Sequence, residues 1–334
     1  MALSYTVTDT TKLSSTAIYG EVLCDLAEQH KDIVALTADL GSSTKIGVFG
    51  EKFPDRFFNV GIAEQNMFGI AAGLAKGGFV AFTSTFGIFN STRALDQVHA
   101  DICYQNVNVK MLGTHAGLSF GQAGSTHHSI EDVGIMRTMA NLRVVIPADG
   151  VETAMAIRCA YATPGPFYIR LNRGFDQRVY TDENYGFTLG KAVELRQGTD
   201  ITVIACGSCV NEALQAAKLL DDQDHLKVRV LDMHTIKPLD EEAVRKAVGE
   251  TRRIITVEDH NIIGGLGSAV AEVVAGFGKG CAFRRLGIPD VFAKIGLHED
   301  LMSIYGIDTN GIIAAVREIM GRDFEEDENW DDEV

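Results

Sequence analysis

Residues 59–67 read Asn-Val-Gly-Ile-Ala-Glu-Gln-Asn-Met, and this stretch decides the fold of the region around it. Its pattern predicts the end of a strand, a short glycine turn and the first turn of a helix. The helix continues almost without charge through residues 71–75, Ala-Ala-Gly-Leu-Ala. Glu64 is therefore carried on an apolar element, where a carboxylate is costly to ionise unless another group pairs with it.

Two functions are open for Glu64 at this point. Carboxylates in apolar surroundings are often acid–base groups, because burial shifts their pKa. A glutamate in the first turn of a helix also complements the helix macrodipole, and that function needs no ligand. The spacing of residues alone does not choose between them.

Outward from this stretch, the first half of the chain alternates helix and strand patterns, which predicts a parallel sheet covered by helices. Strands are expected at residues 32–38, 57–60, 79–83, 107–113, 143–147 and 167–171. Helices are expected at residues 11–30, 64–77, 87–105, 130–139 and 149–162.

After Arg173 the chain becomes polar and aromatic with little periodicity, which predicts an interdomain linker. A second α/β pattern follows it. Its strands are expected at residues 189–195, 200–205, 226–231, 253–257 and 281–286, and its helices at 208–221, 240–248, 266–275, 298–304 and 309–320. We therefore expect two three-layer α/β domains at residues 1–174 and 189–321, a linker at 175–188 and an acidic, disordered tail at 322–334.

Composition excludes several classes of protein. A hydrophobic content of 46% with 22% charged residues is that of a soluble globular protein, and no apolar run is suited to cross a membrane. The net charge is −15, and residues 323–334 hold eight acidic residues and no basic one. This excess of negative charge argues against a nucleic-acid partner, which would require a basic surface. The N-terminal residues lack the pattern of a signal peptide, and the six scattered cysteines favour structural thiols in a reducing cytoplasm.

A glycine-rich polar segment, residues 114–128, follows a predicted strand and should be a loop at the carboxyl edge of the sheet, where open α/β sheets bind ligands. It carries His115, His127 and His128. A metal site on these histidines lacks a carboxylate or cysteine set to complete it, so hydrogen bonds to sugar hydroxyls fit them better.

Three other features are each open to a structural explanation. Phe86 and Phe89 lie three residues apart near a helix start, as core residues do. Arg173 ends a strand, where a surface arginine is common. Residues 264–267, Gly-Gly-Leu-Gly, imitate a dinucleotide fingerprint, but tight packing of a strand against a helix explains them better than nucleotide binding.

The sequence resembles the transketolase family. Residues 59–89, NVGIAEQNMFGIAAGLAKGGFVAFTSTFGIF, are similar to the pyrimidine-binding domain of transketolases and of deoxyxylulose-phosphate synthases. Residues 231–240, 257–260 and 264–269 resemble the C-terminal domain of transketolases and of 2-oxo acid dehydrogenase beta subunits. The resemblance covers residues 15–320 and implies a parallel-sheet thiamine pyrimidine-binding domain followed by a transketolase C-terminal-like domain.

The resemblance also implies a cofactor, thiamine diphosphate. In the family, the glutamate that matches Glu64 contacts the aminopyrimidine ring and shares a proton with it, which activates the cofactor. The match makes Phe89 the platform for that ring, with Phe86 supporting it. Residues 37–43 match another family segment, which places Asp39 beside the cofactor. The apolar surroundings of Glu64 suit a carboxyl group that must share a proton near neutral pH.

For the substrate, residues 114–128 resemble the family segment TH-D-S-x-G-x-GEDGPTHQ. The match places His115 and His127 beside the reacting oxygens as catalytic groups. Residues 168–174 resemble the sugar-phosphate-binding arginine segment of the family, which places Arg173 at the substrate phosphate. Ser43 is a weaker match to a phosphate-contacting serine. The segment also departs from the family, because Ala123 stands where the family has an aspartate that contacts the donor sugar. His128 replaces a glutamine and is a further candidate for substrate binding.

Thiamine enzymes hold Mg²⁺ and the diphosphate with a GDG motif that is followed by an asparagine. Only Ala148-Asp149-Gly150 approaches that motif here, and no suitable asparagine follows it. The resemblance thus implies a match to the last two-thirds of a full-length transketolase, and a separate partner chain that supplies the diphosphate-binding domain and most of the Mg²⁺ site.

We therefore interpret the chain as a subunit of a split transketolase that transfers a two-carbon ketol unit between sugar phosphates. Homodimer contacts would complete a heterotetramer. The alternatives are a subunit like deoxyxylulose-phosphate synthase, a 2-oxo acid decarboxylase beta-type subunit, and a non-catalytic assembly subunit.

Overall fold

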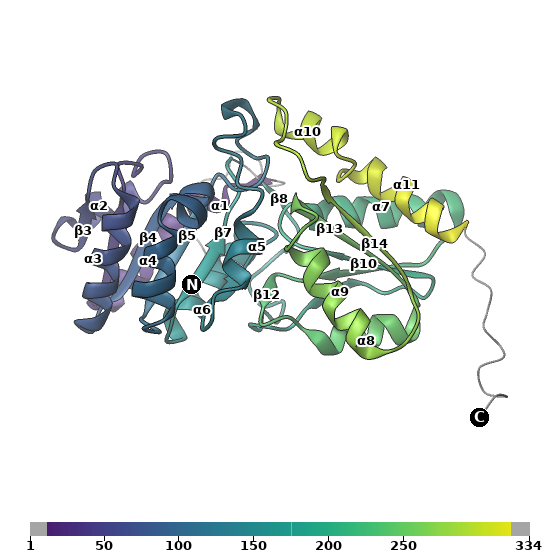
Figure 1. The fold of residues 1–334 in the computed structure, drawn as a ribbon, viewed down its shortest axis with the longest axis horizontal. Coiled ribbons are helices and arrows are strands. Elements are labelled where there is room, and N and C mark those ends of the chain that lie inside the picture. The colour runs from purple at the N-terminus through teal and green to yellow at the C-terminus, as the bar shows by residue number, and fades with distance from the viewer. Residues whose placement is uncertain (1–11, 175, 322–334) are drawn as a thin grey trace.

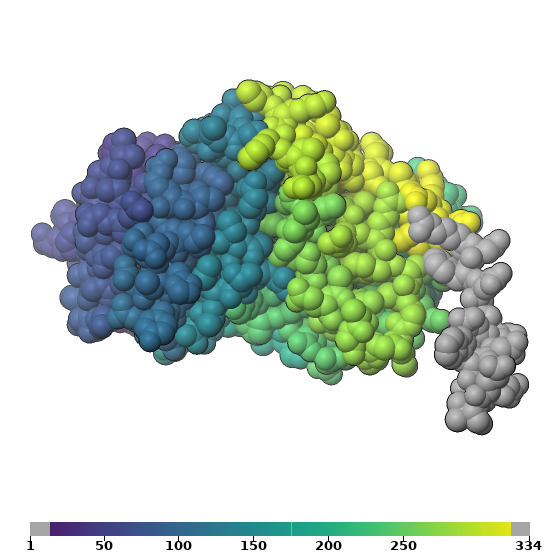
Figure 2. Space-filling model, in the orientation of Figure 1, coloured from purple at the N-terminus to yellow at the C-terminus, as the bar shows by residue number. Residues whose placement is uncertain are grey.

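A computed structural model describes residues 12–174 and 176–321. The two halves of the chain form two α/β units that lie side by side (Figure 1). Figure 2 shows that the two units are in contact along an extended surface. Within the described residues, no helix is both long and apolar enough to cross a membrane.

The first sheet has seven strands in the order β12-β6-β7-β5-β4-β2-β3. Six of them come from the first half and run parallel: β2 (Ile33–Thr37), β3 (Phe57–Asn59), β4 (Val80–Phe86), β5 (Val109–Thr114), β6 (Arg143–Val145) and β7 (Phe167–Arg170). Strands β2, β4, β5 and β7 are buried at every residue, as expected where helices cover both faces.

Helices cover both faces of this sheet. On one face lie α1 (Ser15–Gln29) and α6 (Gly150–Ala162), and on the other lies α3 (Glu64–Lys76). The side chains of Ser14 and Asp149 cap α1 and α6 by accepting a hydrogen bond from a backbone N–H of the first turn. Shorter elements are α2 (Gly47–Lys52), α5 (Asp132–Arg137) and two single turns, Pro54–Arg56 and Gly121–Ala123.

The second sheet has the order β14-β13-β10-β11-β9, and only β9 runs antiparallel to its neighbour. Its strands are β9 (Val193–Arg196), β10 (Ile201–Ala205), β11 (Val228–Asp232), β13 (Arg253–Asn261) and β14 (Ala282–Ile288). One face carries α7 (Cys209–Asp224) and α11 (Thr309–Met320), and the other carries α8 (Glu241–Glu250) and α9 (Leu266–Phe277). A further helix, α10 (His298–Ile304), lies near the junction of the two halves (Figure 1).

The expected fold class, two three-layer α/β units, is confirmed, but the elements differ from the expectation at two places that matter for the site and for the junction of the halves. The single helix expected at residues 87–105 is broken into wide turns of the π type, at Phe89–Arg93 and Val98–Cys103, around the short α4 (Leu95–Gln97). Such turns are rare and occur often at functional sites.

The second difference is β12 (Thr235–Lys237), a strand that the sequence analysis did not predict. It comes from the second half of the chain but pairs antiparallel with β6, at the edge of the first sheet. An edge strand offers unpaired backbone groups, and β12 satisfies those of β6. The two halves therefore share a sheet, which anchors one to the other.

The segment expected as a linker, residues 175–188, packs closely where the structure describes it. Strand β8 (Asp176–Gln177) pairs with β1 (Lys12–Leu13). The rings of Tyr180 and Tyr185 stack with centroids 3.6 Å apart, and Phe187 stacks on His234. The acidic tail expected at 322–334 lies outside the described residues.

Asp149, which lies in the one segment whose sequence approaches the GDG motif, belongs to this junction. Its carboxylate caps α6 and also accepts hydrogen bonds from the backbone N–H groups of Val179 and Tyr180. Close by, the hydroxyl of Tyr180 donates to Asp232 at 2.6 Å and that of Tyr185 donates to Glu152 at 3.0 Å. Three buried carboxyl groups thus hold the linker against both halves.

These carboxyl groups predict a pH dependence of folding. Burial raises the pKa of Asp232 from 3.8 to about 7, although the hydrogen bond from Tyr180 lowers it, and burial also raises the pKa of Glu152. A raised carboxyl pKa in the folded state stabilises the fold at pH below the unfolded value, and that stability is lost as pH rises toward the folded value.

We therefore expect the free energy of unfolding to fall between pH 4 and pH 7 by ~1.4 kcal/mol per pH unit for each such proton. Urea unfolding at several pH values measures this slope. Asp232→Asn should flatten it relative to the wild-type chain, and an unchanged slope in Asp232→Asn would show that Asp232 is not protonated in the folded protein.

Candidate active site

Glu64 is the first residue of α3 and is only 1% exposed. The preceding residue, Ala63, provides no side-chain cap for this helix. Both carboxylate oxygens accept hydrogen bonds from Nη1 of Arg93, at 2.9 and 3.0 Å. The costly buried charge is therefore paired by a single arginine.

Phe89 and Arg93 begin and end the same wide turn after β4. This turn brings the guanidinium of Arg93 over the ring of Phe89, with Cζ 3.9 Å from the ring centroid. Phe86, at the end of β4, stacks on Phe89 with the centroids 5.6 Å apart. Glu64 and Phe89 thus contact the same arginine head group, so the two residues expected at a pyrimidine ring share one neighbour.

The histidines of the loop at residues 114–128 join this group. His115 follows β5 with a left-handed backbone (φ +56°), and its ring lies 4.2 Å from that of Phe86. The ring of His127 meets those of Phe86 and Phe89 at an angle. The ring of Phe120 contacts both histidine rings edge to face. The structure therefore gathers both expected histidines and both expected phenylalanines into one cluster.

His115 is electrically neutral in this cluster. Burial, together with the smaller effect of the positive charges of Arg173 and Lys45, lowers the pKa of its ring from 6.5 to about 4. Nδ1 of its ring lies 3.0 Å from the hydroxyl of Thr114. A neutral imidazole can donate one hydrogen bond and accept another at bound hydroxyls without bringing a charge into the site.

Contacts with the second half fix the position of this loop. Gly117 has φ +58°, and a Cβ there would come 2.1 Å from the Asp259 carboxylate, so only glycine fits. That carboxylate accepts the backbone N–H of Leu118 at 3.0 Å. Farther along, the hydroxyl of Ser125 donates to the carbonyl of Ala293. The segment that carries α10 lies against the loop at the top of Figure 1.

Arg173 lies at the rim of the cluster. Its Cζ is 4.9 Å from the ring centroid of Phe120, and its backbone N–H donates to the hydroxyl of Ser119. The side chain is exposed, so its guanidinium is accessible to a ligand. A groove of about 300 Å³ opens beside it, lined also by Asp176, Glu212 and His298.

Asp39 and Ser43 lie on the loop after β2, and both are exposed. Asp39 has φ +60° and is held by Asn59, whose amide oxygen accepts from the N–H groups of Asp39 and Gly61. Ser43 is next to Ser42, which lines a groove of about 350 Å³ together with Lys45. His128 is placed differently, because its ring is buried and bonds through Nε2 to the carbonyl of Gly121.

Sequence reasoning missed two residues that organise the site, Arg93 and Asn59. Arg93 carries the one charge between Lys76 and Asp96, which is a signal that the sequence analysis did not use. Asn59 belongs to residues 59–67, the stretch that was analysed first. Its hydrogen bond to Asp39 depends on the left-handed backbone at Asp39, which the sequence pattern does not predict.

The glycine segment at 264–267 serves packing. The carboxylate of Glu258 accepts the backbone N–H groups of Leu266 and Gly267 at 2.7 and 2.8 Å, and so fills the helix N-terminus where a phosphate would bind. A Cβ on Gly265 would come 2.0 Å from that carboxylate. The expected explanation, close packing of strand and helix, fits these contacts.

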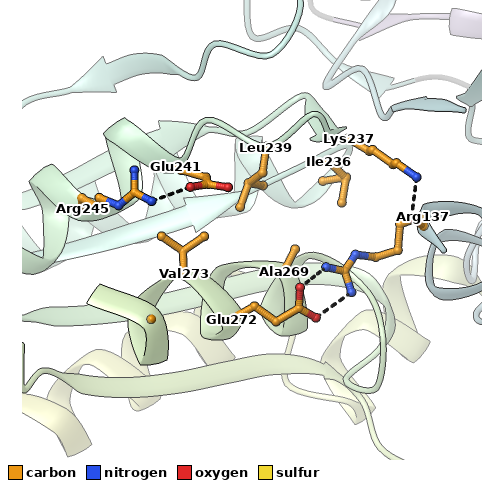
Figure 3. Close-up of a pocket in the computed structure, with 10 residues that line it drawn as sticks. Arg137, Ile236, Lys237, Leu239, Glu241, Arg245, Ala269, Glu272 and Val273 are labelled. Carbon is orange, nitrogen blue, oxygen red and sulfur yellow. Dashed lines mark hydrogen bonds and ion pairs between the residues drawn. The ribbon is translucent and has the colours of Figure 1, made fainter. Parts of the chain in front are cut away.

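A cleft of about 360 Å³ lies between α5, α8 and α9, away from this cluster (Figure 3). Its cations are already paired: Arg137 with Glu272, and Arg245 with Glu241. Lys237 donates to the carbonyl of Arg137 at 3.0 Å. Among residues 12–174 and 176–321, no three histidine, cysteine or acidic side chains converge as metal ligands do.

Comparisons with known proteins agree with this geometry. Residues 11–175 match the family model of the transketolase pyrimidine-binding domain, and residues 190–312 match that of the transketolase C-terminal domain. The chain belongs to the transketolase family. The resemblance noted in the sequence is thereby confirmed.

One relative is a putative transketolase C-terminal section of Methanocaldococcus jannaschii, 41% identical over 91% of this chain and 96% of the relative. Another is a subunit of the apulose-4-phosphate transketolase of Phocaeicola vulgatus, 40% identical over 90% of this chain and 96% of that relative. Both relatives are thus about as long as this chain.

Among solved structures, a split-gene transketolase described as an inactive beta4 tetramer is 38% identical, with a TM-score of 0.85 over 92% of this chain and 98% of that one. The chain spans 48% of the transketolase of Campylobacter jejuni, whose fold it shares with a TM-score of 0.78. The expected match to two-thirds of such an enzyme was therefore too large, and about half is correct.

Proposed function

We propose that this chain is one subunit of a thiamine-diphosphate-dependent transketolase that transfers a two-carbon ketol unit between sugar phosphates. The observation that carries the proposal is the position of Glu64. Its carboxylate is buried at a helix start, and the guanidinium that it accepts hydrogen bonds from also lies over the ring of Phe89. A carboxyl group beside an aromatic face suits a planar, nitrogen-containing ring.

The residues present fit the pyrimidine end of that cofactor. Phe89, supported by Phe86, offers a ring face for stacking, and Glu64 offers a carboxylate that can hold the proton shared with a ring nitrogen. Asp39, held by Asn59, is proposed as a further neighbour of the cofactor. When bound, thiamine diphosphate supplies the nucleophilic carbon for the transfer. The buried setting of Glu64 keeps water from competing for the proton.

On the substrate side, the neutral ring of His115 and the ring of His127 are proposed to donate and accept hydrogen bonds at the sugar oxygens. Arg173 is proposed at the substrate phosphate, because an exposed guanidinium can bind phosphate through two N–H groups, and Ser43 is proposed as a second phosphate contact on a weaker match. Lys45 lies close enough to His115 to lower its pKa, so a second cation is present. His128 contributes indirectly, by holding the loop through Gly121.

A partner chain is proposed to bring the diphosphate-binding domain and most of the Mg²⁺ site. Asp149, the one candidate remnant of that site, is fully engaged at the junction of the two halves. Relatives of the same length are named as subunits or sections of transketolases. Contacts between two copies of this chain would then complete a heterotetramer, with the cytoplasm as the proposed compartment.

The test is to purify the chain with its native partner and to assay ketol transfer with thiamine diphosphate and Mg²⁺ over a panel of ketose phosphates. We expect transfer from the mixture and none from either chain alone. Condensation of pyruvate in place of ketol transfer would indicate a function like that of deoxyxylulose-phosphate synthase. Inactivity of the assembled complex on every donor would favour an assembly subunit.

Arg173→Ala tests the phosphate contact. A hydrogen bond to a charged group contributes roughly 1.5–3 kcal/mol, so KM for phosphorylated substrates should rise about ten- to a hundredfold. Steady-state kinetics with phosphorylated and unphosphorylated forms of one sugar measure the difference.

The matched control is Arg178→Ala, because Arg178 is also exposed but bonds to the carbonyls of Tyr180 and Thr181 in the linker. It should leave both KM values unchanged. Equal effects of Arg173→Ala on the phosphorylated and unphosphorylated sugars would reject a phosphate contact at Arg173.

A further inference from the structure

One guanidinium occupies both surfaces that the proposed function assigns to the pyrimidine ring. Arg93 donates to both carboxylate oxygens of Glu64, at 2.9 and 3.0 Å. Its Cζ also lies 3.9 Å from the ring centroid of Phe89, so the cation covers that face. A ring stacked on this face and hydrogen-bonded to Glu64 would need the same space.

The guanidinium of Arg93 and an aminopyrimidine share the features that let either one occupy this space. A guanidinium is planar, stacks on aromatic rings and presents N–H donors along its edge to a carboxylate. An aminopyrimidine is also planar and has a π face, and its edge carries ring nitrogens and an amino group. Glu64 and Phe89 therefore select for features that both groups have.

The two partners of this arginine differ in their freedom to move. Glu64 is 1% exposed and is fixed at the start of α3, whereas the side chain of Arg93 is 44% exposed. The arginine can therefore turn into solvent, where water satisfies its N–H groups, and leave the carboxylate and the ring face in place.

We propose that Arg93 sets the affinity of this chain for the pyrimidine by competing with it for Glu64 and Phe89. The proposal rests on the proposed function. Arg93 keeps the buried carboxylate paired until the ligand arrives, and binding of the ring displaces it. Arg93 is thus an affinity-determining residue of the site, and no step of the transfer reaction is assigned to it.

The test uses the full chain and 4-amino-5-hydroxymethyl-2-methylpyrimidine, a probe that needs neither Mg²⁺ nor the diphosphate domain. In calorimetry, Arg93→Met should bind the probe at least about tenfold more tightly than the wild type, because no charge-assisted hydrogen bonds must be broken. Arg93→Lys keeps the charge but loses the planar stacking group, and its affinity should lie between the two.

The matched control is Arg317→Met. Arg317 is similarly exposed and bonds to the carboxylate of Asp224 on the far half of the molecule. It should bind the probe as the wild type does. Equal or weaker binding by Arg93→Met, with the control unchanged, would overturn the proposal.

A second measurement uses the wild-type chain, so its result does not depend on whether a variant folds. In the ¹⁵N NMR spectrum of the wild-type chain, the side-chain resonance of Arg93 should shift on addition of the probe, and its restricted rotation should be lost. A resonance that stays unchanged when Glu64 and Phe89 respond to the probe would show that arginine and ring bind together, against the proposal.

The proposal and the proposed function fail in different ways. If Glu64→Gln leaves ketol transfer intact in the assembled enzyme, the function assigned to Glu64 is wrong. If Glu64→Gln abolishes transfer but Arg93→Met does not tighten binding of the probe, only the competition by Arg93 is wrong.

Discussion

Glu64→Gln should lower the turnover of the assembled enzyme at least ~100-fold, the lower end of the range for an acid–base group. An amide can still accept a hydrogen bond from Arg93, so the fold should survive, but it cannot hold and release the proton that a carboxyl group shares with a ring nitrogen. The measurement is kcat for ketol transfer at saturating cofactor and substrate, with the melting temperature as a check on folding.

The control for this variant is Glu28→Gln, which removes an exposed carboxylate that pairs only with Lys52 among the contacts in the described residues. It should change kcat by less than about twofold, because exposed ion pairs contribute little. Near-wild-type turnover of Glu64→Gln at high cofactor concentration would remove the acid–base function and leave Glu64 as a residue that complements the helix start.

Arg170→Met should destabilise the fold by ~3–5 kcal/mol, because it leaves the Asp132 carboxylate without its cationic partner. Both side chains are buried, and Nε of Arg170 donates to Asp132 at 2.9 Å. The same guanidinium donates to the carbonyls of Ser129 and Asp259, so it holds the histidine loop and the second half together. Equilibrium unfolding in urea measures the loss.

Arg245→Met is the matched control, since Arg245 pairs with Glu241 one turn away on the exposed face of α8. That pair is expected to contribute only ~0.3–0.5 kcal/mol. If Arg170→Met is no more destabilising than Arg245→Met, the buried network does not hold the two halves together.

Much of the fold could be predicted from the sequence, because buried parallel strands and amphipathic helices have different patterns of hydrophobic residues. Residues 33–37 and 201–205 are continuous runs of apolar or β-branched residues, and both form internal strands. Strand β12 was not predictable in this way. Its three residues have no period of their own, and they become a strand only because β6 from the other half offers an open edge.

Part of the candidate site was also predictable from the sequence, and part was not. Glu64, Phe86, Phe89, His115 and His127 were singled out from the residues and the resemblance, and the fold brings them together. The contact of Arg93 with Glu64 and Phe89 was not predicted, because it depends on the wide turn at Phe89–Arg93, where a regular helix was expected. Burial of His128 depends on how the loop turns at Gly121, which the sequence pattern does not specify.

The most direct measurement is a crystal structure of this chain assembled with its partner, thiamine diphosphate and Mg²⁺. We predict that the pyrimidine ring will lie against Phe89, with a ring nitrogen within hydrogen-bonding distance of the Glu64 carboxyl group, about 2.6–3.2 Å. A pyrimidine bound away from Glu64, or a ring held by other residues of the complex, would contradict the account.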